Sequence, residues 1–238
     1  MNMLKICSCI YLKILIILYM KIVINSHNKS SIALNHLLES MQMYEEYNNY
    51  EIIIIIGGYY NDIIYYDILK NKNITTIKCN HNSIDFTGLI TLLELYSANI
   101  NDYYLYLHDT CKIGKDFYNK IKSIDLNNVS SIKINKRNSM NIGIYSQKII
   151  NEFKDFLLQK KNTDESKCME FKSIDYNEDY IFDNDKNNIL LNDYDGFIYT
   201  GPIDYYNTGT MRLVEYFPHL DLYKMKANWG QGYWTLNN

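Results

Sequence analysis

The chain has 238 residues, which suits one α/β domain and is long enough to bury roughly 70% of the surface of its unfolded form, so a disordered tail and a small disulfide scaffold are excluded. Its 24 basic and 27 acidic residues are interspersed and leave a net charge of -3, which gives no basic footprint for binding nucleic acid. The five cysteines are odd in number and show no zinc-ligand spacing, which favours free thiols in a reducing compartment such as the cytoplasm.

Residues 1–19 form a hydrophobic extension ahead of the expected domain, 20–238. Lys5 and Lys13 interrupt this extension, so its charge-free runs are far shorter than the ~20 residues that span a bilayer. Met20 stands directly before KIVINS, which is typical of a first β-strand. We therefore expect a dispensable extension, with a weak membrane anchor through residues 1–20 as the alternative.

Four β-rich runs alternate with polar loops and helical periodicity over the first half of the chain. The predicted strands are 21–26, 52–56, 74–79 and 103–107. Apolar residues at helical spacing predict helices after the first and third of these strands, marked by Leu34, Leu37, Leu38 and Met41 and by Phe86, Leu89, Ile90 and Leu93. Strand-loop-helix units that feed a further strand favour parallel pairing. The expected fold class is a three-layer α/β/α sandwich with a mostly parallel central sheet.

The second half is less regular. We expect a short helix around 117–124, strands at 131–134 and 142–146, and a helix over 149–157. The charged, Asn- and Asp-rich stretch 160–195 has little periodicity and is interpreted as a loop or a lid over the site. Residues 196–238 form an aromatic, Gly-rich C-terminal segment, which we expect to fold back over the carboxyl ends of the strands.

Polar side chains follow all four predicted strands, at the edge where open α/β sheets bind their ligands. The tips carry Ser26, Asp62, Asp85 and the pair His108-Asp109. The chain has neither a G-x-G-x-x-G nor a P-loop motif with which to cradle phosphate. A carboxylate and an imidazole at a strand tip could instead coordinate Mg²⁺ or Mn²⁺, which would neutralise a diphosphate leaving group, so Asp109 and His108 are the candidate metal ligands.

At these residues the sequence resembles the GT-A glycosyltransferases, which use nucleotide-diphospho-sugars. The resemblance covers the layout of residues 21–146: INSHNKSS after the first strand, IIIIIGGYYND at the second, and LHDTC where that superfamily has its D-x-D motif. Here Asp109 is flanked by His108 and Thr110, so a strict D-x-D is missing, and Gly57 stands where many relatives carry a base-binding Asp. The chain is also similar to the small glycosyltransferase-like proteins of giant viruses.

This resemblance implies a hexosyltransferase-like enzyme that moves a sugar from a nucleotide-sugar donor to a glycan or protein acceptor. A divalent cation, Mn²⁺ or Mg²⁺, would be its cofactor, and a viral member would act in the host cytoplasm or the viral factory. The donor would be bound by residues at the strand tips and by one arginine of the C-terminal segment: Ser26, Asp62, Asp85, Asp109 and Arg212. Inverting members of this superfamily use a carboxylate base, for which Glu215 and Asp221 are the candidates and Asp204 is the third.

The C-terminal segment holds both tryptophans and one of the two arginines of the chain. Trp229 and Tyr206 could stack on sugar rings, and the planar guanidinium of Arg212 could bind a phosphate through two hydrogen bonds. Lys224 and Lys226 could add charge near a diphosphate, although solvated surface is the commoner role of lysine. The alternative is an arm that packs across the sheet with its tryptophans in the core.

Two other classes of function stay open. A degenerate glycosyltransferase fold could serve as a binding or structural module, because the strict D-x-D is missing. Another nucleotide-dependent α/β enzyme, such as a methyltransferase, is weakly indicated by Gly57-Gly58 after a strand. Fold resemblance alone cannot separate these classes.

Overall fold

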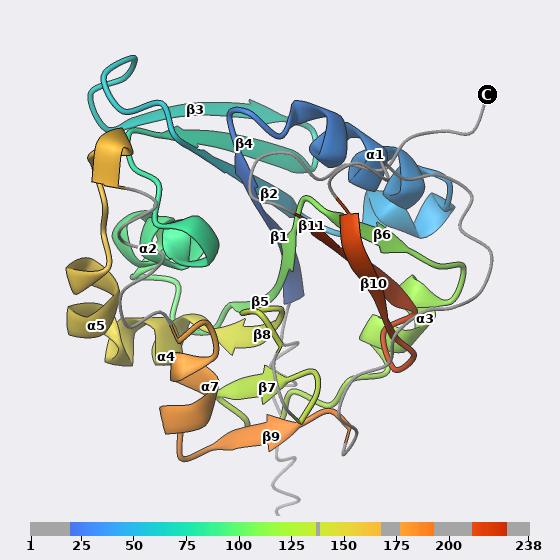
Figure 1. Cartoon of the computed structure of the whole chain (residues 1–238). Helices are drawn as coiled ribbons and strands as arrows, with labels where there is room; N and C mark the ends of the chain where they lie inside the picture. Colours follow the sequence, from blue (N-terminus) through green and yellow to red (C-terminus); the bar gives the residue numbers. More distant parts are fainter. Residues whose placement is uncertain (1–19, 137–138, 168–176, 193–210, 228–238) are drawn as a thin grey trace, which may run out of the picture.

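The computed structural model describes residues 20–136, 139–167, 177–192 and 211–227, within which it has an α/β fold with a large mixed sheet and a small antiparallel one (Figure 1). The large sheet has eight strands and is mostly parallel. In spatial order these are β3 (Tyr66–Asn71), β4 (Ile74–Cys79), β2 (Ile52–Gly57), β1 (Met20–His27), β5 (Tyr103–His108), β8 (Gly143–Ser146), β7 (Ser131–Lys133) and β9 (Asn188–Leu190).

The four strands predicted in the first half of the chain are the parallel centre of this sheet. β1 lies between β2 and β5 and pairs in parallel with both, and β4 pairs in parallel with β2. The side chains of β1, β2 and β5 are buried on both faces, which is why β2 reads as an unbroken run of isoleucines instead of an alternating pattern. The predicted parallel pairing is therefore confirmed.

Helices pack against both faces of the large sheet. α1 (Ser31–Gln42) and α3 (Phe117–Lys122) contribute to one apolar cluster, together with alternate residues of the central strands such as Ile22 and Ile24. The second cluster holds the intervening strand residues, such as Val23. Its helices are α2 (Thr87–Tyr96), α4 (Gln147–Glu152), α5 (Lys154–Gln159) and α7 (Tyr180–Asn184).

Several elements were not predicted from the sequence. β3 is an exposed edge strand that forms a hairpin with β4, so the link from β2 to β4 holds a strand that was not predicted. The helix expected over 149–157 divides at Phe153 into α4 and α5. The stretch 160–195, expected to be a loop, contains η3 (Glu165–Lys167), α7 and β9, and β9 joins the large sheet beside β7. Short length and weak periodicity hide such elements from a sequence reading.

The small sheet connects the end of the described chain to the tip of β5. β6 (Cys111–Ile113) follows β5 after a two-residue turn and pairs with β11 (Leu222–Ala227), which pairs with β10 (Met211–Phe217). In Figure 1 this hairpin lies beside β6. For residues 211–227, the expectation that the C-terminal segment returns to the carboxyl end of a central strand agrees with this pairing.

Candidate functional site

The order of the strands defines a switch point between β1 and β5. The chain passes from β1 outward to β2 and β4, and then returns to place β5 on the other side of β1 (Figure 1). Ligands of α/β proteins bind outside the carboxyl ends of the strands at such a point. The residues at this point are Asn25, Ser26 and His27 of β1 and His108 and Asp109 after β5.

Ser26 and Asp109 meet at the switch point. The Ser26 hydroxyl donates to Asp109 Oδ2 at 2.9 Å, and the Asp109 amide donates to the carbonyl of Asn25 at 3.1 Å. Burial raises the pKa of the Asp109 carboxyl to about 6, and this rise is what remains after the charge of Lys224 and the Ser26 bond have lowered it. A buried carboxylate that titrates near neutrality at a strand tip is typical of a functional group.

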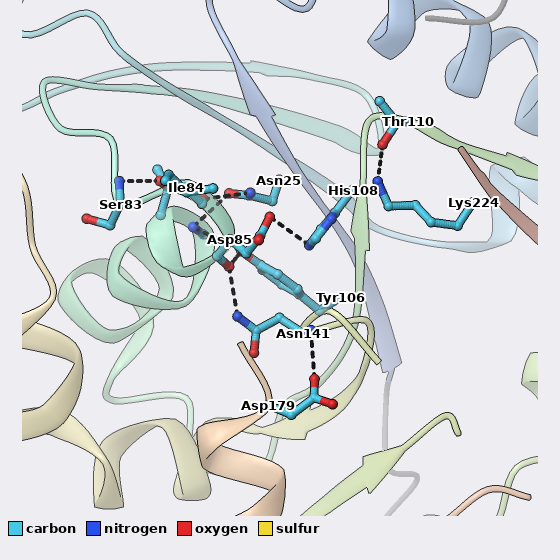
Figure 2. A network of polar contacts seen from close by, with 12 residues as sticks. Asn25, Ser83, Ile84, Asp85, Tyr106, His108, Thr110, Asn141, Asp179 and Lys224 are labelled. Atoms are coloured by element: carbon cyan, nitrogen blue, oxygen red, sulfur yellow. Dashed lines mark hydrogen bonds and ion pairs between the residues drawn. The ribbon is translucent and has the colours of Figure 1, made fainter. Parts of the chain in front are cut away.

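Asp85 and His108 form a second pair at the same edge. The Asp85 carboxylate lies 3.5 Å from His108 Nε2, and both side chains are largely buried (Figure 2). The Asp85 carbonyl accepts from the hydroxyl of Tyr106 at 2.9 Å, and the Asn141 side chain lies 3.4 Å from the same oxygen. Asp85, His108 and Asp109 are therefore brought together from two segments that are far apart in the sequence.

Asn25 holds the loop that carries Asp85. Its side-chain amide donates to the carbonyl of Ile84 at 3.0 Å and accepts from the amide of Gly88 at 2.9 Å. Ile84 has a φ of 54°, a left-handed conformation that is costly for a β-branched residue. The Ile84 amide is bound by Asn82 Oδ1 at 3.0 Å, so both polar groups of the strained residue are fixed. Strain held in this way is common beside functional sites.

Lys224 reaches the same region from the small sheet. In the β6–β11 pairing it lies opposite Cys111, two residues beyond Asp109. Its ammonium contacts the hydroxyl of Thr110 and lies 3.3 Å from the carbonyl of Met225 (Figure 2). Lys224 is buried, and its charge lowers the pKa of Asp109. The sequence indicated solvated surface as the commoner role for this lysine, and the alternation in LYKMKA, which sets Lys224 on the face opposite Tyr223 and Met225, gave no signal of its burial.

The two candidate bases lie at different places in the small sheet. Glu215 is half-buried and stands opposite Lys224 in the β10–β11 pairing, near the Asp109 end. Asp221 lies in the hairpin turn at the other end, next to Gly114. The Asp221 carboxylate accepts from the Asp116 amide at 2.8 Å and from the Tyr216 hydroxyl at 2.9 Å. These bonds give Asp221 a role in holding the turn, so Glu215 is the better placed candidate.

Close packing explains why glycine occupies positions 57 and 58 at the tip of β2. A Cβ at Gly57 would lie 2.9 Å from the His81 carbonyl oxygen, and one at Gly58, whose φ is 92°, would lie 2.4 Å from His27 Nε2. Protein atoms therefore fill the space beside both glycines. Burial is also the first cause that lowers the pKa of His27 to about 4, so this imidazole is neutral at pH 7.

Of the remaining predicted residues, the structure describes Asp62 and the backbone of Arg212. Asp62 is exposed in the turn after β2, where its amide donates to the Tyr59 carbonyl at 2.6 Å. Arg212 lies at the irregularity of the β10–β11 pairing, where Met211 and Leu213 change register, and only its backbone is described. Asp204, Tyr206 and Trp229 lie outside the described residues, so their expected roles stay predictions.

The donor set does not suit a divalent cation held by Asp109 and His108. These adjacent residues have different partners. Asp109 binds Ser26, whereas His108 faces Asp85, away from Lys224 (Figure 2). Within the described ranges, no three acidic, histidine or cysteine side chains are grouped closely enough to hold a metal ion. The cation shown next to Asp109 and Thr110 is the Lys224 ammonium.

Comparison with known proteins gives no family model, no curated protein and no solved structure that matches the chain. None of the helices described here is both long and apolar enough to span a membrane. The functional argument therefore depends on the residues at the switch point.

Proposed function

We propose that the chain is a GT-A-like glycosyltransferase, an α/β/α three-layer domain that transfers a sugar from a nucleotide-diphosphate donor to a glycan or protein acceptor. The observation that carries the proposal is the bond between Ser26 and Asp109 at the switch point of the parallel strands. Asp109 follows the fourth parallel strand, where the resemblance puts the acidic motif that faces the donor diphosphate.

The roles of the individual residues follow from their positions. Ser26 and Asp85 flank Asp109 at the strand tips and can bind hydroxyl groups of the donor. Glu215 stands across from Lys224 and is the candidate base for the acceptor hydroxyl in an inverting reaction. Close packing accounts for Gly57 and Gly58 without a ligand, because a Cβ at either position would meet His81 or His27, and this weakens the argument for a methyltransferase.

A thermal-shift panel tests this function. The full chain is melted with UDP- and GDP-linked sugars, with and without Mn²⁺, and with S-adenosylmethionine as the competing ligand class. Saturation at about 100 times Kd stabilises a fold by about 2.7 kcal/mol, which the melt resolves. Stabilisation by a nucleotide sugar, followed by release of the nucleoside diphosphate when an acceptor is added, supports transfer.

The other outcomes separate the alternatives. Binding without turnover on any glycan or peptide acceptor would favour a degenerate binding module. Stabilisation by S-adenosylmethionine alone, or by no nucleotide sugar at all, would contradict the proposal.

A further inference from the structure

β3 is the outer strand of the large sheet, and within the described part of the chain it pairs with β4 alone (Figure 1). Five of its six residues are exposed, among them Ile68 at 53% and Leu69 at 68%. Ile64 and Tyr65, just before the strand, are exposed as well. The strand has no proline, and its register with β4 runs without a bulge. Edges of this kind accept a further strand.

The backbone alternation of β3 decides which residues direct their polar groups outward. Tyr65 bonds inward, because its carbonyl accepts from the Asn80 amide at 3.2 Å. In an antiparallel strand, residues that bond to one neighbouring strand alternate with residues that face the other side. Tyr66, Ile68 and Lys70 therefore direct their N–H and C=O groups away from β4. Within the described ranges these groups bond to no other strand.

A second copy of β3 matches these outward groups. In an antiparallel pairing about a twofold axis at Ile68, the two Ile68 residues lie opposite each other, and Tyr66 of each copy lies opposite Lys70 of the other. Each of these pairs exchanges two main-chain hydrogen bonds. The Tyr66 hydroxyl binds Glu94, and Lys161 pairs with the same carboxylate at 2.7 Å. The incoming Lys70 thus meets a group whose charges are balanced.

Other antiparallel registers are disfavoured by charge or by the turn. An axis at Asp67 or at Lys70 would set two like charges directly opposite each other, which is destabilising. An axis at Leu69 would place Tyr66 opposite Lys72, whose φ of 51° departs from the extended conformation. The sequence of β3 therefore specifies one register for pairing with itself.

We propose that β3 is a docking edge at which a second copy of this chain pairs, so that the two eight-stranded sheets form one continuous sheet across a twofold axis at Ile68. Such strand addition takes its affinity from main-chain hydrogen bonds and its register from side chains. A contact made by one short strand is smaller than a standard interface, so we expect a Kd of about 1 to 100 µM. This inference does not depend on the proposed reaction.

The full wild-type chain gives the first test. Sedimentation between about 0.5 and 500 µM should show a monomer at the low end and a dimer at the high end. Amide hydrogen exchange, measured by NMR at both ends, locates the contact. Exchange at Ile68 and Lys70 should slow by about tenfold or more in the dimer, because their N–H groups become bonded. The amides of Asp67 and Leu69 face β4 and should change little.

Two variants then test the register. Ile68→Lys sets two ammonium groups opposite each other across the axis and should weaken the dimer by about tenfold or more. Leu69→Lys is the matched control, because it adds the same charge at the adjacent exposed position, where it would face Asp67 of the second copy. Its dimer should be at least as tight as wild type, although Asp67 also pairs with Lys78 of its own chain at 3.2 Å.

The outcomes decide the proposal. A dimer with slowed exchange at Ile68 and Lys70, lost in Ile68→Lys and kept in Leu69→Lys, supports it. A wild-type chain that stays monomeric would overturn it, as would slow exchange at Ile68 that does not depend on concentration, since the edge would then be covered within one chain. Equal weakening by both variants would indicate general apolar association and also overturn it. Sedimentation and exchange use the wild-type protein, so they decide even where a variant does not fold.

Discussion

Asp109 combines a buried carboxyl with a position at the tip of β5, and its protonation links stability to pH. Its pKa is raised from 3.8 to about 6 in the folded chain, so the folded state binds its proton more tightly than the unfolded state between about pH 4 and about pH 6. The free energy of unfolding that Asp109 contributes therefore decreases as pH rises through this window. Ionised Asp109 is a cost to the fold at neutral pH, which is expected of a group kept for binding.

Asp109→Asn should consequently stabilise the chain at pH 8, by about 1 to 3 kcal/mol, and have little effect near pH 4, where both side chains are neutral. Urea unfolding of wild type and variant at the two pH values measures this difference. His27 and His81 titrate in both proteins, so their contributions to the difference in unfolding free energy cancel. Asp62→Asn, an exposed carboxyl in a turn, is the control and should change stability by less than about 0.5 kcal/mol. A variant that is less stable than wild type at pH 8 would contradict this account.

At the scale of elements, Asp179 fixes the turn between β7 and β8. Its carboxylate accepts from the amides of Ser139 at 2.7 Å and Asn141 at 3.1 Å, and it lies 3.2 Å from the Lys133 ammonium. Met140 and Asn141 both have positive φ, with values of 52° and 61°, so this turn needs external support. Because Asn141 also contacts the Asp85 carbonyl, the turn connects the start of α7 to the candidate site (Figure 2).

Asp179→Ala should cost about 3 to 5 kcal/mol, because it leaves a buried ammonium without one of its two carboxylate partners and leaves two buried amides unbonded. Asp183→Ala breaks the other ion pair of Lys133, but its side chain is 46% exposed, so we expect a loss below about 1 kcal/mol. Equilibrium unfolding in urea compares the two variants, and similar losses would show that the turn does not depend on Asp179.

The central elements were predictable because their local signals are strong. Five successive isoleucines define β2, and regular apolar spacing defines α1 and α2. β3 and β9 were missed because edge strands this exposed carry no clear apolar alternation. At the site, Asp109 and Ser26 were predictable from strand ends, whereas the supporting roles of Asn25 and Lys224 depend on tertiary contacts that no local pattern encodes.

At the scale of the whole molecule, β1 is the central strand and begins at Met20. Residues 20–238 should therefore fold cooperatively, with a melting temperature within a few degrees of that of the full chain. The chain 24–238 is the matched control: it lacks half of β1, including the buried Ile22 and the Lys21 pair with Asp102 at 2.8 Å, and should not fold. Circular dichroism melts compare the three proteins. Loss of cooperativity in 20–238 would show that residues 1–19 stabilise the domain.

The bond between Ser26 and Asp109 and the contact between Lys224 and Thr110 join the beginning, the middle and the end of the described chain. A nascent chain released before the β10–β11 hairpin is translated contains the serine and the aspartate but not the lysine. Such long sequence separation makes closure of the site a late, slow event in folding. Premature termination or proteolysis after β9 would therefore leave a partly folded protein that lacks the Lys224 ammonium beside Asp109. The complete set of contacts at the site forms only in a chain that includes the β10–β11 hairpin.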